Sequence, residues 1–174
     1  MPIDQYSGEL LAESQLAVAE VLLSRVLEAI EGNPNSDPIS ESYTFLGDLA
    51  YDDCCGVLAA SPLRAFSTIN FPQPTTSVTN CNSSLLAVDI IVVLLRCHPV
   101  IDPANRIPTT EAQSLSFGGA SGDGAIIHNV LLGDLPEGWE SAGIEQSTSS
   151  VDGGCVAIDT RVTIGLPQST WCIT

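Results

Sequence analysis

A chain of 174 residues with 44% apolar side chains is long enough to bury the core of one domain, and we expect residues 1–174 to form a single domain. Its 21 acidic side chains face five arginines and no lysine, a net charge of −16, which excludes the basic patch that nucleic-acid binding needs. The sequence has no uncharged apolar run of roughly 18 residues and no signal-peptide pattern at its start. We therefore expect a soluble protein that is not exported by a signal.

The first predicted element is a helix from Leu10 to Glu31. Ser7 can cap its start, and Gly32-Asn33-Pro34 ends it. Apolar residues recur at helical spacing along one face, at Leu16, Ala19, Leu23, Val26 and Ile30. We expect all of these except Ala19 to pack against a sheet face that is built by Val88, Ile90 and Val92.

The residues after this helix predict two strands joined by a long connection. Asn33 to Ser42 is a loop rich in Asn, Pro and Ser, and a strand between Cys55 and Leu63 is interrupted by Pro62. The polar run from Phe71 to Ser84 predicts a projecting loop. Ser84 to Val100 is apolar on both faces and predicts a central strand, covered on one side by the first helix and on the other by a second helix or a neighbouring subunit.

The rest of the chain predicts a second helix and a closing strand. Pro108 to Leu135 is helical, with Thr109-Thr110-Glu111 at its start, and the glycine-rich run from Gly118 to Gly124 breaks it. That run is not a phosphate loop, because no lysine follows it. Gly133 to Gly154 is polar and acidic and predicts an exposed loop. Val156 to Leu166 alternates apolar and polar residues, which predicts a strand with one buried and one polar face.

The order of these elements predicts an α+β fold, in which a mainly antiparallel sheet is packed by the N-terminal helix and a second helix. The N-terminal helix takes about residues 10–31, and the sheet and the second helix take about residues 43–166. No element is assigned to the tail, residues 167–174.

The six cysteines are too few for a disulfide scaffold and are expected to be mostly reduced, buried thiols. Adjacent Cys54 and Cys55 would point to opposite faces of a strand, so they do not form the usual C-x-x-C metal clasp. A single disulfide, formed after the protein leaves the cell, and a zinc site that includes Cys97 and His98 both stay open, with the disulfide favoured. Cys97 and His98 are sequence neighbours that would face opposite sides of a strand, which argues against a thiol nucleophile with its base. We predict no enzyme and no cofactor.

Five short segments occur in a fixed order along the chain: Asp53-Cys54-Cys55-Gly56, Phe71-Pro72-Gln73-Pro74, Cys81, Arg96-Cys97 and Gly153-Gly154-Cys155. We call them the marker segments. Over roughly residues 50–166 they resemble the tail terminator or head-to-tail connector proteins of actinobacterial long-tailed phages. The resemblance implies a tail-terminator-like fold. Whether the closest role is that of a terminator, a stopper (head-closure) protein or an adaptor stays open.

The resemblance also implies a function in the neck of the virion. Such a protein is a subunit of a ring, typically hexameric, that caps the tail tube and joins it to the head. Its partners are further copies of itself, the major tail tube protein and the head-closure or connector proteins, with no membrane and no cofactor. It would be made and assembled in the host cytoplasm. DNA passes through the lumen of the ring without specific binding. A secreted, disulfide-stabilised binding module and a thiol enzyme remain as more distant alternatives.

Two sets of candidate functional residues follow. The loops at Phe71 to Ser84 and Gly133 to Gly154 are expected to contact partners, in particular through Phe71, Pro72, Gln73, Pro74, Gly153 and Gly154. Acidic side chains on the lumen wall would keep DNA from sticking, since a basic wall would hold its phosphates. The candidate acids are Asp52, Asp53, Asp89, Glu111, Asp123 and Asp159. Two alternatives stay open: Asp89 pairs with an arginine inside the sheet or a subunit interface, and Asp159 lies on the outside of the ring. Solubility alone is a competing explanation of the acidity.

Overall fold

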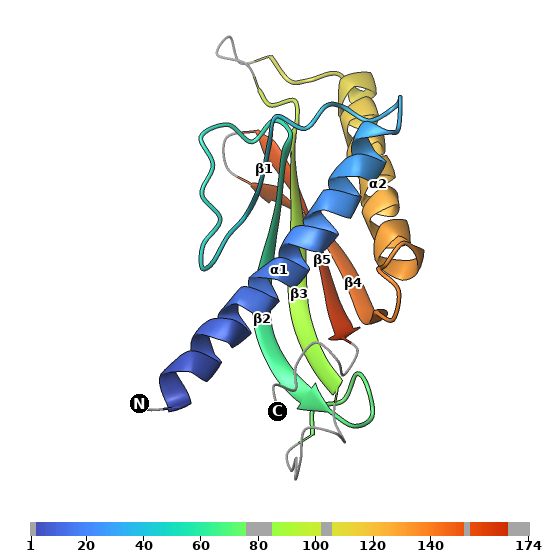
Figure 1. Cartoon of the computed structure of the whole chain (residues 1–174). Coiled ribbons are helices and arrows are strands. Elements are labelled where there is room, and N and C mark those ends of the chain that lie inside the picture. The colour runs from blue at the N-terminus through green and yellow to red at the C-terminus, as the bar shows by residue number, and fades with distance from the viewer. Residues whose placement is uncertain (1–2, 76–84, 102–105, 152–153, 167–174) are drawn as a thin grey trace.

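The computed structural model describes residues 3–75, 85–101, 106–151 and 154–166. The chain forms a five-stranded sheet with two helices packed against it (Figure 1). The elements are α1 (Ile3–Glu31), β1 (Glu41–Thr44), β2 (Val57–Thr68), β3 (Leu85–Cys97), α2 (Thr110–Gly133), β4 (Glu140–Val151) and β5 (Cys155–Leu166). The predicted α+β class is confirmed.

The sheet has the strand order β1-β2-β3-β5-β4 and is mixed. β1 runs parallel to β2, whereas β2, β3, β5 and β4 pair in an antiparallel way. The prediction of a mainly antiparallel sheet therefore misses the parallel edge strand, which lies where no separate strand was assigned. The register of β2 on β3 shifts between Pro62 and Arg64, because proline cannot donate a ladder hydrogen bond. β2 continues past that irregularity to Thr68.

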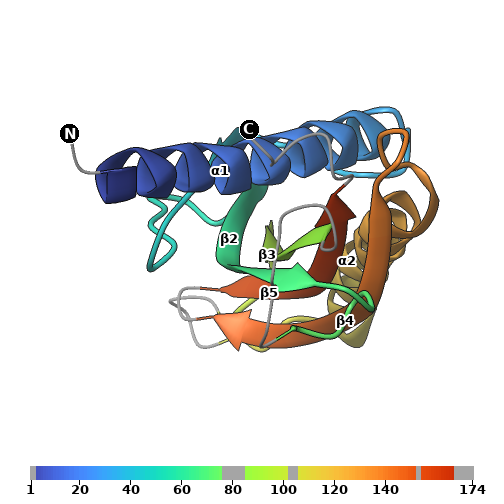
Figure 2. The same ribbon diagram turned by 60° about the horizontal axis from the view of Figure 1, so that its bottom comes forward.

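The main hydrophobic core lies between the helices and one face of the sheet. Leu23, Val26 and Ile30 of α1 are buried in the same cluster as Val88, Ile90 and Val92 of β3, as predicted. Leu16 is only partly buried and lies outside this cluster. Leu22, which was not selected from the sequence, is fully buried. Leu16 and Leu22 differ in burial because of the place where α1 crosses the sheet. The N-terminal part of α1 extends past the sheet, and only the C-terminal half of the helix covers the sheet (Figures 1 and 2).

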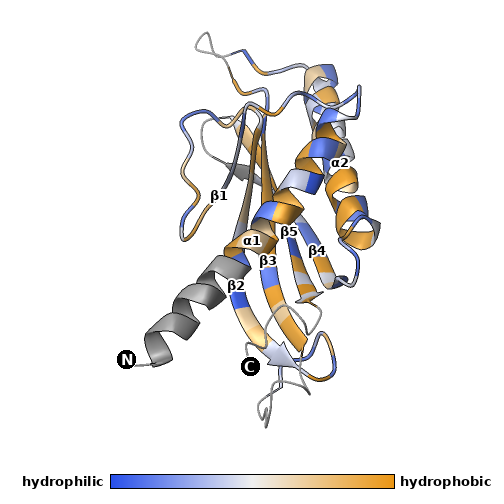
Figure 3. Cartoon of the chain, viewed as in Figure 1, coloured by the Kyte–Doolittle hydropathy of each residue, from blue (hydrophilic) through white to orange (hydrophobic). Residues whose placement is uncertain are grey.

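Both helices cover the same face of the sheet. α1 and α2 contact each other, and Ile127 and Leu131 of α2 join the core cluster of α1. Hydrophobic residues predominate along β3, as Figure 3 shows. Because both helices lie on one face of the sheet, α2 does not cover the opposite face of β3. The sequence left either the second helix or a neighbouring subunit as the cover of that face. The segment between β1 and β2 covers part of that face, where Phe45, Leu49 and Tyr51 pack on a second cluster. That cluster is formed by Cys54, Val57, Val93, Leu95, Cys155 and Ala157.

The predicted helix break at Gly118 to Gly124 is wrong, because α2 runs unbroken from Thr110 to Gly133. Thr109 caps its start by accepting a hydrogen bond from the Ala112 N–H. A glycine costs a helix about 1 kcal/mol relative to alanine, a cost that tertiary contacts can offset. At Gly124 the missing side chain makes room for β4: an added Cβ would lie 2.9 Å from Gln146 Oε1, and Gln146 Nε2 donates to the Gly124 carbonyl.

The predicted exposed loop from Gly133 to Gly154 is also wrong, since most of it forms β4. β4 is a polar edge strand that pairs with β5 through its backbone, so its sequence carries no apolar alternation. The strand predicted from Val156 to Leu166 is confirmed as β5, with Ile158, Val162 and Ile164 buried toward the helices. The first helix begins at Ile3, earlier than the predicted Leu10. Cys81, Gly153 and the tail at 167–174 lie outside the described residues.

Candidate functional site at the cysteine-linked end of the sheet

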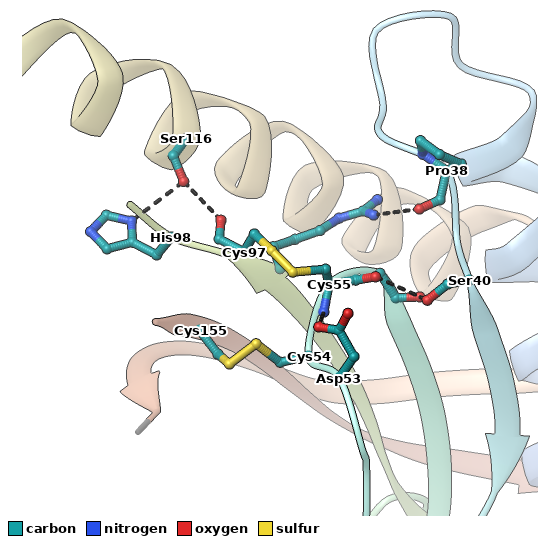
Figure 4. Close-up of a disulfide and its surroundings, with 11 residues drawn as sticks. Pro38, Ser40, Asp53, Cys54, Cys55, Cys97, His98, Ser116 and Cys155 are labelled. Carbon is teal, nitrogen blue, oxygen red and sulfur yellow. Dashed lines mark hydrogen bonds between the residues drawn. A yellow bond between two sulfur atoms is a disulfide. The ribbon is translucent and has the colours of Figure 1, made fainter. Parts of the chain in front are cut away.

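Three marker segments come together at one end of the sheet, as Figure 4 shows. Cys97 ends β3 and Cys155 begins β5, and the register of the two strands places these residues opposite each other. Disulfides join Cys54 to Cys155 and Cys55 to Cys97, with Cα–Cα distances of 5.9 and 4.7 Å. The expectation of reduced thiols is therefore wrong for these four residues, and so is the zinc site through Cys97. The favoured alternative counted one disulfide, whereas the described residues alone contain two.

The adjacent cysteines reach two different strands because they lie in a turn rather than in a strand. Asp53 Oδ1 accepts a hydrogen bond of 3.0 Å from the Cys55 N–H. Gly56 has φ +89°, a conformation that favours glycine, and an added Cβ would lie 2.7 Å from the Pro38 carbonyl oxygen. The Gly56 N–H donates to the Leu95 carbonyl of β3 at 3.1 Å. Each residue of the first marker segment thus has a structural role in this turn.

Arg96, which precedes Cys97, forms a buried ion pair with Asp123 of α2. Its Nε donates to Asp123 Oδ2 at 2.8 Å, and its Nη2 lies 2.7 Å from the same oxygen. Nη1 and Nη2 also donate to the carbonyls of Pro38 and Asp37, at 3.0 and 2.8 Å. Arg96 is 5% exposed and Asp123 is 3% exposed. One guanidinium therefore ties together β3, α2 and the segment after α1, and Asp123 has no surface with which to line a lumen.

A cavity of about 270 Å³ adjoins this ion pair, between the end of β3 and α2. Ser116 and His98 line it, with Ser116 Oγ 3.3 Å from His98 Nδ1. The Ser116 hydroxyl donates its only proton to the Cys97 carbonyl at 3.0 Å. His98 Nδ1 and the Cys97 carbonyl both contact this hydroxyl, so Ser116 links α2 to the end of β3. Sequence reasoning missed this contact, because it joins residues from separate elements.

Asp89 lies on the sheet face away from the helices and is neutralised there. Its carboxylate is paired with Arg64 Nε of β2 and accepts a hydrogen bond of 2.7 Å from Thr163 Oγ1 of β5. The Arg64 guanidinium also lies 4.9 Å from the centre of the Phe66 ring. The alternative in which Asp89 pairs with an arginine inside the sheet is confirmed.

The remaining candidate acids differ in exposure. Asp159 is partly buried, and this burial raises the pKa of its carboxyl against the opposing charge of Arg161. Asp52, Asp53 and Glu111 are exposed. Asp53 begins the turn from Asp53 to Gly56, which we call the cysteine turn, and Asp52 directly precedes it. Glu111 lies in the first turn of α2.

The second marker segment lies at the opposite end of the sheet, beyond the end of β2. Thr68 Oγ1 donates to the Gln73 carbonyl at 2.7 Å, which folds this segment back onto the strand. The Phe71 ring packs on Gly165 of β5, where an added Cβ would lie 3.1 Å from the ring. Gly154 lies at the cysteine-linked end, and its carbonyl accepts a hydrogen bond of 2.7 Å from the His98 N–H. The predicted contact residues that the structure describes therefore lie at two opposite ends of the sheet.

No protein-family model matches this chain, and a search of curated proteins finds no significant match. None of the helices in the described part of the chain is long and apolar enough to span a membrane.

Proposed function

We propose that this protein is a structural subunit of a phage neck, which forms a ring that caps the tail tube and joins it to the head. The order of its marker segments supports this role. Four of them fall at the ends of the sheet, where disulfides and hydrogen bonds hold Asp53, the four cysteines and Gln73 in place. Residues that hold a scaffold together, rather than a reactive group, are what a subunit that acts by association requires.

The position of the marker segments is the observation that carries the proposal. The cysteine turn, Arg96-Cys97 and Gly154 lie at one end of the sheet, and Phe71-Pro72-Gln73 lies at the other. A neck subunit must present one surface to the tail tube and a different one to the head. A rigid sheet with ordered segments at both ends fits that need, because loops that project from a rigid scaffold commonly carry contacts.

The closed ring would arise from a heterologous interface, in which one patch of a subunit meets a different patch of the next. Acidic side chains on the lumen wall would keep a layer of water and counterions between the wall and DNA. Asp52, Asp53 and Glu111 are the exposed candidates for this wall. Asp89 and Asp159 contribute less free charge, because one is paired with Arg64 and the other is partly buried.

Native mass spectrometry of the purified chain tests the ring. We expect a species with close to six times the mass of the chain, and a strictly monomeric protein at high concentration would contradict the proposal. Addition of purified tail tubes then separates the roles within the neck. A terminator binds the tube end, whereas a stopper or adaptor binds the connector of the head and leaves the tube unbound.

The two disulfides favour a second candidate, a secreted and disulfide-stabilised binding module. Virions also reach an oxidising environment once they leave the cell, so both candidates accommodate these bonds. The mass measurement distinguishes them, because a secreted module is expected as a monomer or dimer that binds no tail tube.

A further inference from the structure

The two disulfides differ in their access to solvent. Cys97 is exposed and Cys55 is partly exposed, so a dissolved thiol can reach the bond between them. Cys54 and Cys155 are buried, with exposed fractions of 7% and 4%. Thiol–disulfide exchange requires attack by a thiolate on a disulfide sulfur, so access decides which bond reacts first. The Cys55–Cys97 bond is the outer disulfide, and the Cys54–Cys155 bond is the inner one.

The outer disulfide lies next to the inner one at both of its ends. Cys55 follows Cys54 in the chain, and Cys97 lies directly opposite Cys155 in the antiparallel pair of β3 and β5. Opposed residues in such a pair have Cα atoms about 4.5–5.5 Å apart. Disulfides accept Cα–Cα distances of about 4.4–6.8 Å. Cys97 and Cys155 are therefore placed for a bond to each other without movement of either strand.

We propose that the four cysteines form a two-step redox relay that releases the turn before β2 from the sheet. In the first step a dithiol reductant attacks the sulfur of Cys97, the more exposed residue of the pair, breaks the outer disulfide and frees Cys55 as a thiolate. The second thiol of the reductant then closes the reductant's own disulfide and frees Cys97. In the second step the Cys97 thiolate attacks Cys155, forms a cross-strand disulfide and releases Cys54 as a thiolate, which takes up a proton.

The electrons lost and gained in these two reaction steps are equal in number. The reductant loses two electrons and becomes a disulfide, and the four relay cysteines pass from two disulfides to one disulfide and two thiols. The single remaining bond joins β3 to β5, so the sheet stays linked. The turn that carries Cys54 and Cys55 loses both of its covalent anchors. Phe45, Leu49 and Tyr51, which cover the second hydrophobic cluster, precede that turn in the same segment. The relay therefore governs how firmly this segment covers that face.

Two substitutions that each remove the outer disulfide distinguish the relay from simple reduction. Cys55→Ser leaves the attacking Cys97 thiol in place, whereas Cys97→Ser removes it. Both are made together with Cys81→Ser and Cys172→Ser, so that only the relay cysteines are counted. Peptide mapping after alkylation of free thiols should find a Cys97–Cys155 disulfide and an alkylated Cys54 in the Cys55→Ser protein. In the Cys97→Ser protein the Cys54–Cys155 disulfide should persist and should be reduced at least about tenfold more slowly than the outer disulfide of the parent.

Partial reduction of the wild-type chain provides a test that needs no variant. With limiting dithiothreitol, the species in which these four cysteines hold one disulfide should carry the Cys97–Cys155 bond and alkylated Cys54 and Cys55. A one-disulfide species that retains Cys54–Cys155 would overturn the relay, as would loss of both bonds in a single step. The relay does not depend on the ring, so its failure would leave the proposed function untouched.

Discussion

Replacement of Arg96 by methionine tests whether the buried ion pair holds the cysteine-linked end of the sheet together. The variant keeps an unbranched apolar stem but removes every donor of the guanidinium. Among the described residues, the Asp123 carboxylate then has no buried cation beside it, and the carbonyls of Asp37 and Pro38 lose their donor. Since Asp123 is 3% exposed, water cannot replace the lost partner without opening the structure.

The expected cost follows from the burial of this pair. Removal of one partner from a buried ion pair costs about 3–5 kcal/mol, because the remaining charge is uncompensated. For a chain of this size that corresponds to a fall in Tm of roughly 6–20 °C. Arg25→Met is a matched control, because Arg25 also binds a carboxylate and a carbonyl, both of Asp134. Those side chains are 34% and 67% exposed, and surface pairs contribute about 0–1 kcal/mol.

Urea unfolding with the disulfides intact, followed by circular dichroism, measures both variants under the same conditions. A double variant, Arg96→Met with Asp123→Leu, should recover most of the loss, because it leaves no buried charge without a partner. Equal stability of the Arg96→Met and Arg25→Met proteins would refute the reasoning, and so would a double variant less stable than Arg96→Met alone.

Three further predictions concern stability. Leu22→Ala should lower the free energy of unfolding by about 2–5 kcal/mol, and Leu16→Ala by clearly less, because only Leu22 lies in the core; thermal melts of the two proteins compare them. Gly122→Ala, on an open stretch of α2, should raise stability by up to about 1 kcal/mol in urea titrations, whereas Gly56→Ala should lower it, because its Cβ meets a backbone oxygen. Burial raises the pKa of the Asp159 carboxyl, so the folded state holds the proton of this carboxyl at a higher pH than the unfolded state does. Protonation therefore stabilises the folded state, and this stabilisation is lost as pH rises through the raised pKa. Asp159→Asn should therefore be the more stable protein at pH 7, with a gain that vanishes below the usual pKa of 3.8; a gain that is constant with pH would contradict this.

The sequence by itself determined the elements in which apolar residues follow a regular pattern. The apolar spacing of α1, the continuous apolar run of β3 and the alternation of β5 each reflect how one element contacts its surroundings. Each of these elements was predicted in its correct place, with errors of up to three residues at the ends of the two strands, whereas α1 begins at Ile3 rather than at the predicted Leu10. The charge balance and the order of the marker segments are likewise properties of the chain alone, and the expectation of a neck protein rests on them.

The tertiary structure decided everything that depends on which elements become neighbours. β4 is a strand only because β5 offers its backbone a partner, and α2 continues through its glycines because contacts with Arg96 and Gln146 hold it. The four described cysteines allow three fully paired arrangements, and the fold holds Cys54 beside Cys155 and Cys55 beside Cys97. Nothing in the sequence around Asp123 distinguishes it from the other acidic residues, and only the fold places Arg96 beside it. Long-range contacts of this kind leave no periodic trace in a single sequence, because their two halves are encoded far apart.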